Sequence, residues 1–284
     1  MPTEYFEQRE RALLGPRYEQ LYAAPQQTAE RGVTVSALRT TPEQFAQRAD
    51  FPLEPSPFCK AGFVVQDPAF KPGRHPYHHA GVFYSQEPSA SSAAPLLGVR
   101  PGMRVLDTCA APGGKTTQIA ALTQGQAHLT ACEMSIPRAE KLEANLHRQG
   151  AKNVPVMRID ARELDEFFRF DRILLDAPCT GTGTVISGNE KSLRGPTEQL
   201  LGKCARSQRA LLDRAMGALK PGGTLVYSTC SILPQENEDA LQEALDKHMD
   251  CELIPLDGTP SESETRRAQE AGEEPRVESN ALTE

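Results

Sequence analysis

The sequence lacks tryptophan altogether and has no long apolar segment. A helix that spans a membrane needs roughly eighteen or more consecutive apolar residues, and the 284 residues contain no such run. Met1–Glu10 is polar and acidic, without the basic and apolar regions of a secretory signal peptide. We therefore expect a soluble, cytoplasmic protein that does not bind membranes, and we expect a monomer.

Paired-cysteine motifs are absent too. The seven cysteines are an odd number, they are spread along the chain, and none forms a CxxC pair. This pattern excludes a disulfide framework and a zinc ribbon. The histidines of His75–His79 have no cysteines spaced to complete a metal site, so we predict free thiols and no metal. The cysteines are Cys59, Cys109, Cys132, Cys179, Cys204, Cys230 and Cys251.

An excess of basic charge is also lacking, because the formal net charge is −7. Proteins that bind phosphates tend to be basic, so this balance argues mildly against a nucleic-acid partner. Most of the excess acid, however, lies in residues 251–284. The rest of the chain is close to neutral, which leaves room for a local basic surface.

The pattern of the chain predicts four segments. Residues 1–76 are expected to form a small α+β domain, and residues 77–100 a connector that packs on the main domain. Residues 101–255 are expected to be the main domain. The acidic residues 256–284 have almost no large apolar side chains, so we expect disorder there.

Three signals support the small N-terminal domain. Apolar residues recur at helical spacing over Thr3–Ala23, and Gly32–Leu38 alternates like a strand. Thr41 followed by Pro42 is typical of a helix N-cap with proline at the first helical position.

In the main domain, short apolar runs alternate with amphipathic stretches, which is typical of a parallel sheet with crossover helices. We therefore predict an α/β fold. The expected strands are Arg104–Leu106, His128–Cys132, Pro155–Ile159, Arg172–Leu175 and Thr224–Tyr227. The expected helices are Lys115–Leu122, Pro137–Gln149, Glu198–Leu219 and Gln235–His248.

A glycine turn follows the first of these strands, within Val105–Thr116. Backbone amides in such a turn can approach a ligand closely. The turn differs from the phosphate loop of nucleotide-hydrolysing proteins, since position 109 is Cys where that motif has glycine. A nucleotide-hydrolysing activity is therefore not favoured.

Acidic residues stand at the ends of four expected strands, where an open α/β sheet binds its ligands. Glu133 can accept both ribose hydroxyls of a nucleoside. A pocket lined with carboxylates suits a cationic sulfonium cofactor better than an anionic one. Any one of these acids could merely cap a helix, but four in series favour a ligand site. They are Asp107, Glu133, Asp160 and Asp176.

Two cysteines follow neighbouring strands of the expected sheet. Cys179 lies after the fourth strand and Cys230 after the fifth, so we expect both thiols at the edge where the cofactor binds. Carbon 5 of cytosine takes a methyl group only after a thiolate has added to carbon 6. Two thiols can divide the addition and the release between them, and their spacing leaves open which does which.

Other residues are candidates to assist at the base. Asp176 could protonate the ring nitrogen or hydrogen-bond to it as the thiolate adds. Lys191 and Arg194 could hold the target phosphate or help to orient the base. The remaining cysteines are interpreted as small buried side chains, except that the backbone at Cys109 lies near the cofactor.

Together these motifs resemble the NOL1/NOP2/Sun family of RNA cytosine-C5 methyltransferases, and most closely its bacterial members that modify 16S ribosomal RNA. The likeness covers roughly residues 1–250. It is carried by the run Asp107–Thr116, by Asp176-Ala177-Pro178-Cys179, and by Ser228-Thr229-Cys230-Ser231 with Pro234 and Glu236-Asn237-Glu238 after it.

The resemblance implies a Rossmann-like, S-adenosylmethionine-dependent methyltransferase fold behind the smaller N-terminal domain, which would contact RNA. It implies formation of 5-methylcytosine, in ribosomal RNA ahead of transfer RNA, with Cys230 as the nucleophile and Cys179 assisting release. The S-adenosyl-L-methionine site would comprise Cys109, Ala110, Ala111, Pro112, Gly113, Gly114, Lys115, Glu133, Arg138, Asp160 and Asp176. The catalytic set would be Cys230, Cys179, Asp176 and Lys191.

One departure from the family pattern keeps other functions open. Members usually continue with a closing strand pair, whereas this chain runs into its acidic tail, so we expect the sheet to lack those strands. A factor that binds cofactor or RNA with weak catalysis is one alternative. A small-molecule methyltransferase is another, although it would need no second cysteine.

Overall fold

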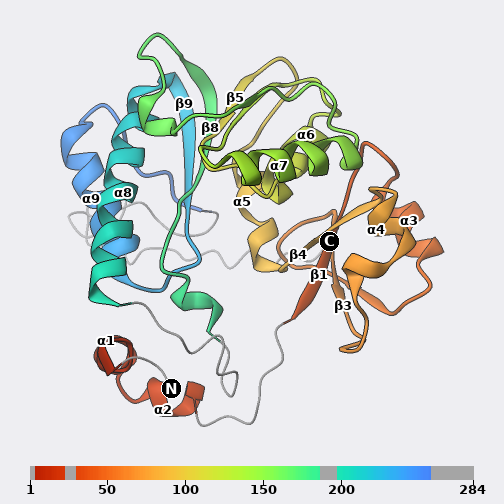
Figure 1. The fold of residues 1–284 in the computed structure, drawn as a ribbon, viewed down its shortest axis with the longest axis horizontal. Coiled ribbons are helices and arrows are strands. Elements are labelled where there is room, and N and C mark those ends of the chain that lie inside the picture. Colours follow the sequence, from red (N-terminus) through yellow and green to blue (C-terminus); the bar gives the residue numbers. More distant parts are fainter. Residues whose placement is uncertain (1–3, 23–29, 186–196, 257–284) are drawn as a thin grey trace, which may run out of the picture. The chain divides into compact units, whose positions relative to one another are not determined.

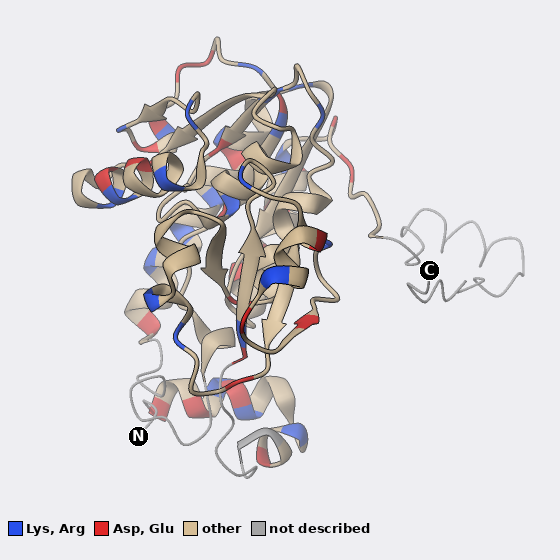
Figure 2. Cartoon of the chain, turned by 90° about the vertical axis from the view of Figure 1, so that its right-hand side faces the viewer, with Lys and Arg blue, Asp and Glu red and all other residues tan. Residues whose placement is uncertain are grey.

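The computed structural model describes residues 4–22, 30–185 and 197–256 (Figure 1). The chain divides into two compact units, residues 1–244 and 245–284, and the elements discussed below lie in the first, apart from the last turn of helix α9. In the part of the chain that is described, no helix combines the length and the apolar character needed to cross a membrane. Figure 2 shows acidic and basic residues interspersed along the helices.

The N-terminal sheet is antiparallel, with strand order β2-β3-β1-β4. Its strands are β1 (Arg31–Val35), β2 (Leu53–Pro55), β3 (Gly62–Val65) and β4 (Phe83–Gln86). The helices of this region are α1 (Glu4–Leu14), α2 (Arg17–Tyr22), α3 (Pro42–Arg48) and α4 (Pro76–His79). The cap predicted for α3 is confirmed, because the Thr41 hydroxyl accepts a hydrogen bond from the backbone N–H of Gln44 at 3.2 Å.

The prediction that residues 77–100 are only a connector is wrong in part. Phe83–Gln86 forms strand β4, which pairs with β1 from Gly32 to Val35. The N-terminal sheet therefore extends past residue 76. The expected strand over Gly32–Leu38 is also shorter, ending at Val35, after which the Ser36 hydroxyl donates to the carbonyl of Gln149 at 2.9 Å.

Aromatic rings fill the core of this sheet. The ring of Phe45, from α3, lies 5.6 Å from that of Phe63 and 5.7 Å from that of Phe83, measured between centroids. Edge-to-face and tilted contacts of this kind add to the free energy gained from burying the rings. Helix α3 is thereby fixed to strands β3 and β4.

The main sheet has five parallel strands in the order β7-β6-β5-β8-β9. This arrangement confirms the predicted α/β, Rossmann-like fold. The strands are β5 (Arg104–Asp107), β6 (His128–Cys132), β7 (Val156–Met157), β8 (Phe170–Asp176) and β9 (Leu219–Ser228). The helices are α5 (Ala93–Leu96), α6 (Gly114–Leu122), α7 (Ile136–Gln149), α8 (Glu198–Gly217) and α9 (Glu238–Lys247).

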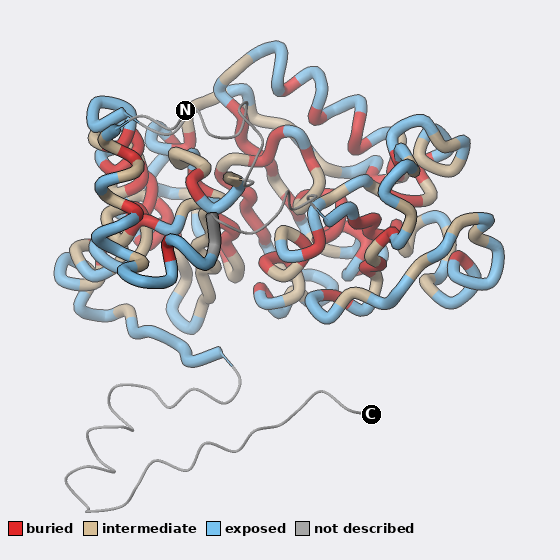
Figure 3. Tube along the Cα trace, turned by 90° about the horizontal axis from the view of Figure 1, so that it is seen from below, coloured by how far each residue is buried: buried red, intermediate tan, exposed pale blue. Residues whose placement is uncertain are grey.

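The side chains of the central strands form much of the hydrophobic core. β5, β6 and β8 have apolar side chains that are nearly all inaccessible to solvent, as expected for a parallel sheet covered on both faces. Figure 3 draws all buried residues of the described chain in red and the exposed ones in pale blue. The fully buried members include Val105, Leu106, Leu129, Ala131, Ile173, Leu174 and Leu175.

Several predicted boundaries in this domain were wrong by a few residues. β7 contains two residues where five were expected, since only Val156 and Met157 pair with β6. β9 begins at Leu219, which was expected to end the preceding helix but pairs with Phe170. Helix α9 begins at Glu238, because Pro234–Glu236 forms a 3-10 turn, η5.

The N-terminal sheet is joined closely to the main domain through the end of α7. Gln149 Nε2 donates to the carbonyl of Phe83 at 2.9 Å. Gly81 has a φ of +74°, and a Cβ there would lie 1.8 Å from the carbonyl oxygen of Arg148. Only glycine fits such a close approach of two backbones.

Candidate active site

The loop after β5 is shaped by a glycine and held by side chains of α7. Gly113 precedes helix α6 with a φ of +109°, and a Cβ there would lie 2.9 Å from Leu142 Cδ1. Asn145 Nδ2 donates to the carbonyl of Pro112 at 2.6 Å, and Arg138 donates to that of Ala111 at 2.9 Å. These contacts leave the first N–H groups of α6 at the carboxyl edge of the sheet, where a ligand can approach them.

Asp107, at the end of β5, is a buried carboxyl group, 1% exposed. Its Oδ2 accepts a hydrogen bond from the Thr116 hydroxyl at 2.7 Å. Its Oδ1 has no hydrogen-bond partner among the described residues. Burial raises the pKa of Asp107 to about 7, and the Thr116 hydroxyl opposes that shift. A cation or donor placed against Oδ1 would complete the site.

Glu133 follows β6 and is 4% exposed. Its Oε1 accepts the backbone N–H of Ser135 at 2.9 Å, and its Oε2 lies 3.3 Å from an Arg138 nitrogen. Arg138 therefore links the loop after β5 to the acid after β6. The structure brings these predicted cofactor residues together at one edge.

Asp160 and Cys109 complete the predicted cofactor set. Asp160 caps the 3-10 turn η3 (Ala161–Glu163), and the guanidinium of Arg162, with Nε 2.9 Å from Asp160 Oδ1, lowers the pKa of Asp160. Burial raises the pKa of the Cys109 thiol to about 12. A thiol that stays protonated at neutral pH is a poor nucleophile.

Asp176, at the end of β8, accepts hydrogen bonds from two side chains. Lys115 Nζ, from the first turn of α6, lies 2.6 Å from Asp176 Oδ2, and the Ser228 hydroxyl donates to Oδ1 at 2.8 Å. The sequence grouped Lys115 with the cofactor loop. Its amine pairs with Asp176, which was predicted both for the cofactor site and for the catalytic set.

The two predicted cysteines meet at the ends of β8 and β9. Cys179 Sγ lies 3.2 Å from Cys230 Sγ, and the backbone N–H of Cys230 also points to Cys179 Sγ at 3.3 Å. Both are free thiols, and Cys230 is the exposed one. With Cys179 as the donor of this contact, the pKa of Cys230 is lowered to about 7, while the contact and burial raise the pKa of Cys179. A lowered pKa favours the thiolate form of Cys230 near neutral pH.

Sequence reasoning missed the residues that hold these two loops together. The Thr182 hydroxyl lies 2.9 Å from that of Ser231 and accepts the N–H of Ile232 at 2.9 Å. The buried carboxylate of Glu236 accepts the N–H of Thr180 at 2.9 Å. In the sequence, Glu236 appeared only as part of the run that carries the family resemblance, and no role was assigned to it.

Some predicted residues fall elsewhere. Lys191 and Arg194 lie outside the described residues. The interpretation of the remaining cysteines as buried side chains is confirmed for Cys59, Cys132 and Cys204, whereas Cys251 is partly exposed. Within the described ranges, no group of three or more His, Cys, Asp or Glu side chains is placed to hold a metal ion.

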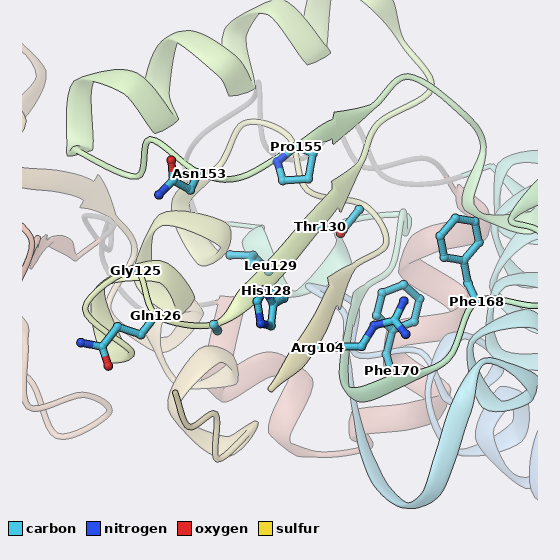
Figure 4. Close-up of a pocket in the computed structure, with 11 residues that line it drawn as sticks. Arg104, Gly125, Gln126, His128, Leu129, Thr130, Asn153, Pro155, Phe168 and Phe170 are labelled. Atoms are coloured by element: carbon cyan, nitrogen blue, oxygen red, sulfur yellow. The ribbon is translucent and has the colours of Figure 1, made fainter. Parts of the chain in front are cut away.

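A hollow lies at the opposite edge of the same sheet. It has a volume of about 630 Å³ and is bordered by the first residues of β5 and β6 (Figure 4). The side chains around it include Arg104, Gln126, His128, Asn153, Phe168 and Phe170. None of the cysteines or acids described above belongs to its lining.

Two protein families match this chain. The family described as 16S rRNA methyltransferase RsmB/F matches residues 94–277, and the N-terminal domain of 16S rRNA methyltransferase RsmF matches residues 1–88. Among solved structures, a methyltransferase homologue from Pyrococcus horikoshii has a TM-score of 0.74 and 32% identity over 92% of this chain and 88% of that one. NSun6 from Pyrococcus horikoshii, solved with SFG, has a TM-score of 0.75 over 86% of this chain and 87% of that one, and at 22% identity it supports the fold alone.

Curated relatives carry the name ribosomal RNA small subunit methyltransferase F. The relative from Aeromonas hydrophila is 40% identical over 243 residues, which is 81% of this chain and 50% of that protein. The relative from Serratia proteamaculans is 39% identical over 243 residues, 82% of this chain and 50% of its own length. The chain therefore spans about half the length of these relatives. By the match over most of its length, the chain belongs to the RsmB/F family of 16S rRNA methyltransferases.

Proposed function

We propose that this protein transfers a methyl group from S-adenosylmethionine to carbon 5 of a cytosine in small-subunit ribosomal RNA, in the cytoplasm. The observation that carries the proposal is the 3.2 Å separation of Cys179 Sγ and Cys230 Sγ at the carboxyl edge of the sheet. Methylation of a more nucleophilic atom needs no such pair of thiols. The names of the relatives favour ribosomal over transfer RNA.

The residues at the ends of β5 and β6 fit the cofactor. When bound, S-adenosylmethionine supplies a methyl group on a positively charged sulfur. The unpartnered Oδ1 of Asp107 suits a cationic group, and Glu133 suits the ribose hydroxyls of the nucleoside. The backbone from Cys109 to Lys115, together with Arg138 and Asp160, would line the rest of the site.

Cys230 would act as the nucleophile. Its thiolate adds to carbon 6 of the base, a sulfur–carbon bond forms, and the electron pair of the ring double bond becomes available at carbon 5. Asp176, held by Lys115 and Ser228, is placed to donate or accept a proton at the ring nitrogen. Carbon 5 then bonds to the transferred methyl group and gives its proton to solvent water, or to the Cys179 sulfur after that thiol has lost its own proton. The double bond re-forms and the sulfur of Cys230 leaves as a thiolate, a step that Cys179 would assist.

The N-terminal sheet would contact the RNA beside this site. Its backbone contacts with the end of α7, at Phe83 and Gly81, fix it to the main domain. A substrate surface shared by both would therefore need little rearrangement on binding. We propose that the protein acts as a monomer.

The test is transfer of a labelled methyl group from S-adenosylmethionine to unmodified ribosomal RNA, followed by nucleoside analysis. Label should appear in 5-methylcytidine, and Cys230→Ala should lower the rate by roughly a thousandfold or more. Cys179→Ala should accumulate a covalent protein–RNA adduct. Cys251→Ala is the matched control and should behave like the parent protein. Full activity in Cys230→Ala would exclude the proposed mechanism.

A further inference from the structure

A buried carboxylate lies behind the two cysteines. Glu236, the last residue of η5, has a side chain that is 0% exposed. Its Oε1 accepts hydrogen bonds from the backbone N–H of Thr180 at 2.9 Å and from Gln208 Nε2 at 3.0 Å. Its Oε2 accepts one from the Thr180 hydroxyl. Two of these donors are N–H groups, which cannot accept, so Oε1 must be an acceptor.

These contacts fix the chain on both sides of Cys179. Thr180 follows Cys179 directly and is held through its backbone and its side chain. Gln208, from α8, donates to Glu236 and also to the carbonyl of Pro178, which precedes Cys179, at 2.9 Å. The cysteine thus lies between two anchored residues.

Glu236 itself belongs to the segment that follows Cys230. The Tyr227 hydroxyl, in β9, donates to the backbone carbonyl of Glu236 at 2.5 Å. The N–H of Glu236 donates to the carbonyl of Leu233 at 3.0 Å. The backbone of Glu236 is therefore tied to the Cys230 segment, and its side chain to the Cys179 segment.

We propose that Glu236 is a positioning residue that holds the Cys179 thiol against Cys230 and so sets the reactivity of the nucleophile without touching the substrate. The functional meaning of this role rests on the covalent mechanism proposed above. Hydrogen bonds weaken steeply as their geometry worsens. A small retreat of Cys179 from its 3.2 Å separation would therefore remove the stabilisation of the Cys230 thiolate.

Other charges also act on Cys230. Asp176 opposes the thiolate and Lys115 favours it, and these two are paired at 2.6 Å. Neither takes part in the hydrogen bonds of Glu236 described above. A substitution at Glu236 leaves this ion pair in place, so a changed pH profile of Cys230 reports on Cys179.

The experiment measures the rate at which iodoacetamide alkylates Cys230, as a function of pH, by mass spectrometry of the peptide that carries Cys230. The variants are Glu236→Ala and Glu236→Gln. A glutamine oxygen can still accept both N–H donors, and its amide can donate to the Thr180 hydroxyl, so Glu236→Gln should rescue the parent profile. Glu238→Ala, an exposed acid two positions away, is the matched control. Folding is followed by circular dichroism.

In the parent protein the alkylation midpoint should lie near pH 7. In Glu236→Ala it should rise toward that of an ordinary thiol, with the rate at neutral pH roughly tenfold lower. A folded Glu236→Ala protein with the parent profile would overturn the proposal, since a merely structural role moves thermal stability and leaves the profile unchanged.

If Glu236→Ala does not fold, Gln208→Met gives the same test. This variant removes the Gln208 amide, which donates to the carbonyl of Pro178 and to Glu236. A smaller rise in the alkylation midpoint of Cys230 is therefore expected. A parent profile in that variant would equally refute the role of Glu236. The alkylation assay uses neither RNA nor cofactor. If the alkylation profiles are as expected but the protein transfers no methyl group to RNA, the proposed function is contradicted and the role of Glu236 is not.

Discussion

The two edges of the parallel sheet differ in the chemical groups that they bring together. At the carboxyl edge, Asp176 is bonded to Lys115 and Ser228, and Cys179 contacts Cys230. At the amino edge, Asp171 accepts the backbone N–H of Arg104 at 2.7 Å and pairs with Lys220 at 2.8 Å. The Arg104 guanidinium lies over the ring of Phe170, 5.8 Å from its centroid, beside the hollow of Figure 4. No cysteine lines that hollow, so the pair of thiols sets the carboxyl edge apart.

The difference follows from chain direction. Every strand of the sheet ends at the same edge, so the loops of four strands converge there and can bond to one another. Helix α6 also begins at that edge, with its free N–H groups. At the amino edge, Asp171 joins the starts of β5, β8 and β9 through Arg104 and Lys220. Because the thiols and the proposed cofactor site lie at the carboxyl edge, substitutions there should have the larger effects on activity.

After the loss of activity expected for Cys230→Ala, the largest effect is expected from Gly113→Ala at the carboxyl edge. A φ of +109° strains any residue with a Cβ, and the new atom would press on Leu142 at 2.9 Å. A cost of about 1–3 kcal/mol is expected, and affinity for S-adenosylmethionine should fall by up to about 100-fold if the loop shifts to relieve it. Calorimetric titration and thermal unfolding measure both quantities.

The matched control is Gly217→Ala, at the end of α8. A Cβ there meets no atom within 4 Å, so stability and affinity should stay close to those of the parent protein. Equal effects at Gly113 and Gly217 would show that the loop after β5 has no special geometry for the cofactor.

A smaller effect is expected from Cys179→Ala on the thiol of Cys230. Cys179 donates the hydrogen bond that lowers the pKa of Cys230 to about 7, so its removal should raise that pKa toward the ordinary thiol value. Alkylation of Cys230 at neutral pH should slow roughly tenfold, because fewer molecules carry the thiolate while each thiolate reacts faster. An unchanged profile would mean that the thiol pair does not activate Cys230.

Asp107→Asn should change how cofactor affinity depends on pH. The pKa of Asp107 is raised to about 7 by burial, so the parent protein gains a negative charge as pH rises through 7. Affinity for the cationic cofactor should then increase by up to about tenfold between pH 6 and pH 8. The asparagine variant stays neutral and should lose this dependence, and it also controls for groups that titrate on the cofactor.

The same group predicts a trend in stability without cofactor. Between the ordinary carboxyl pKa and about 7, the folded protein holds a proton on Asp107 that the unfolded chain releases. The contribution of Asp107 to the free energy of unfolding should therefore fall as pH rises through that window. A trend that is identical in Asp107→Asn would assign the pH dependence to other groups.

The sequence predicted the carboxyl edge better than its surroundings. Strand ends could be placed because β-branched and aliphatic runs stop at Asp107, Glu133 and Asp176, and neighbouring strands then bring Cys179 to Cys230. Strand β4 was missed because its partner β1 lies about fifty residues earlier, and Phe83–Gln86 alone resembles a connector. The pairing of Lys115 with Asp176 spans 61 positions and leaves no local pattern.

Glu236 shows why some residues of the site could not be predicted from the sequence. In the sequence it stands among Gln235, Asn237 and Glu238, a polar run typical of the exposed start of a helix. The proline at position 234 instead gives a 3-10 turn that directs Glu236 inward, where it is fully buried. Its three donors come from Thr180 and Gln208, which are distant in the sequence, so local pattern could not predict its burial.

The smallest effect is expected from His128→Ala at the amino edge. His128 is exposed, it begins β6, and it borders the hollow of Figure 4. Five positions of strand separate it from Glu133, which at about 3.3 Å per residue places it roughly 17 Å from the carboxyl edge. Cofactor affinity, Cys230 alkylation and methyl transfer should each change by less than about twofold, as for most exposed substitutions.

The opposite result for His128→Ala would also be informative. If methyl transfer to ribosomal RNA fell tenfold while cofactor affinity and Cys230 alkylation stayed at the parent values, the hollow would be part of the surface that binds RNA. Both edges of the sheet would then contact the same RNA: the carboxyl edge would carry out the reaction, and the amino edge would contribute to binding.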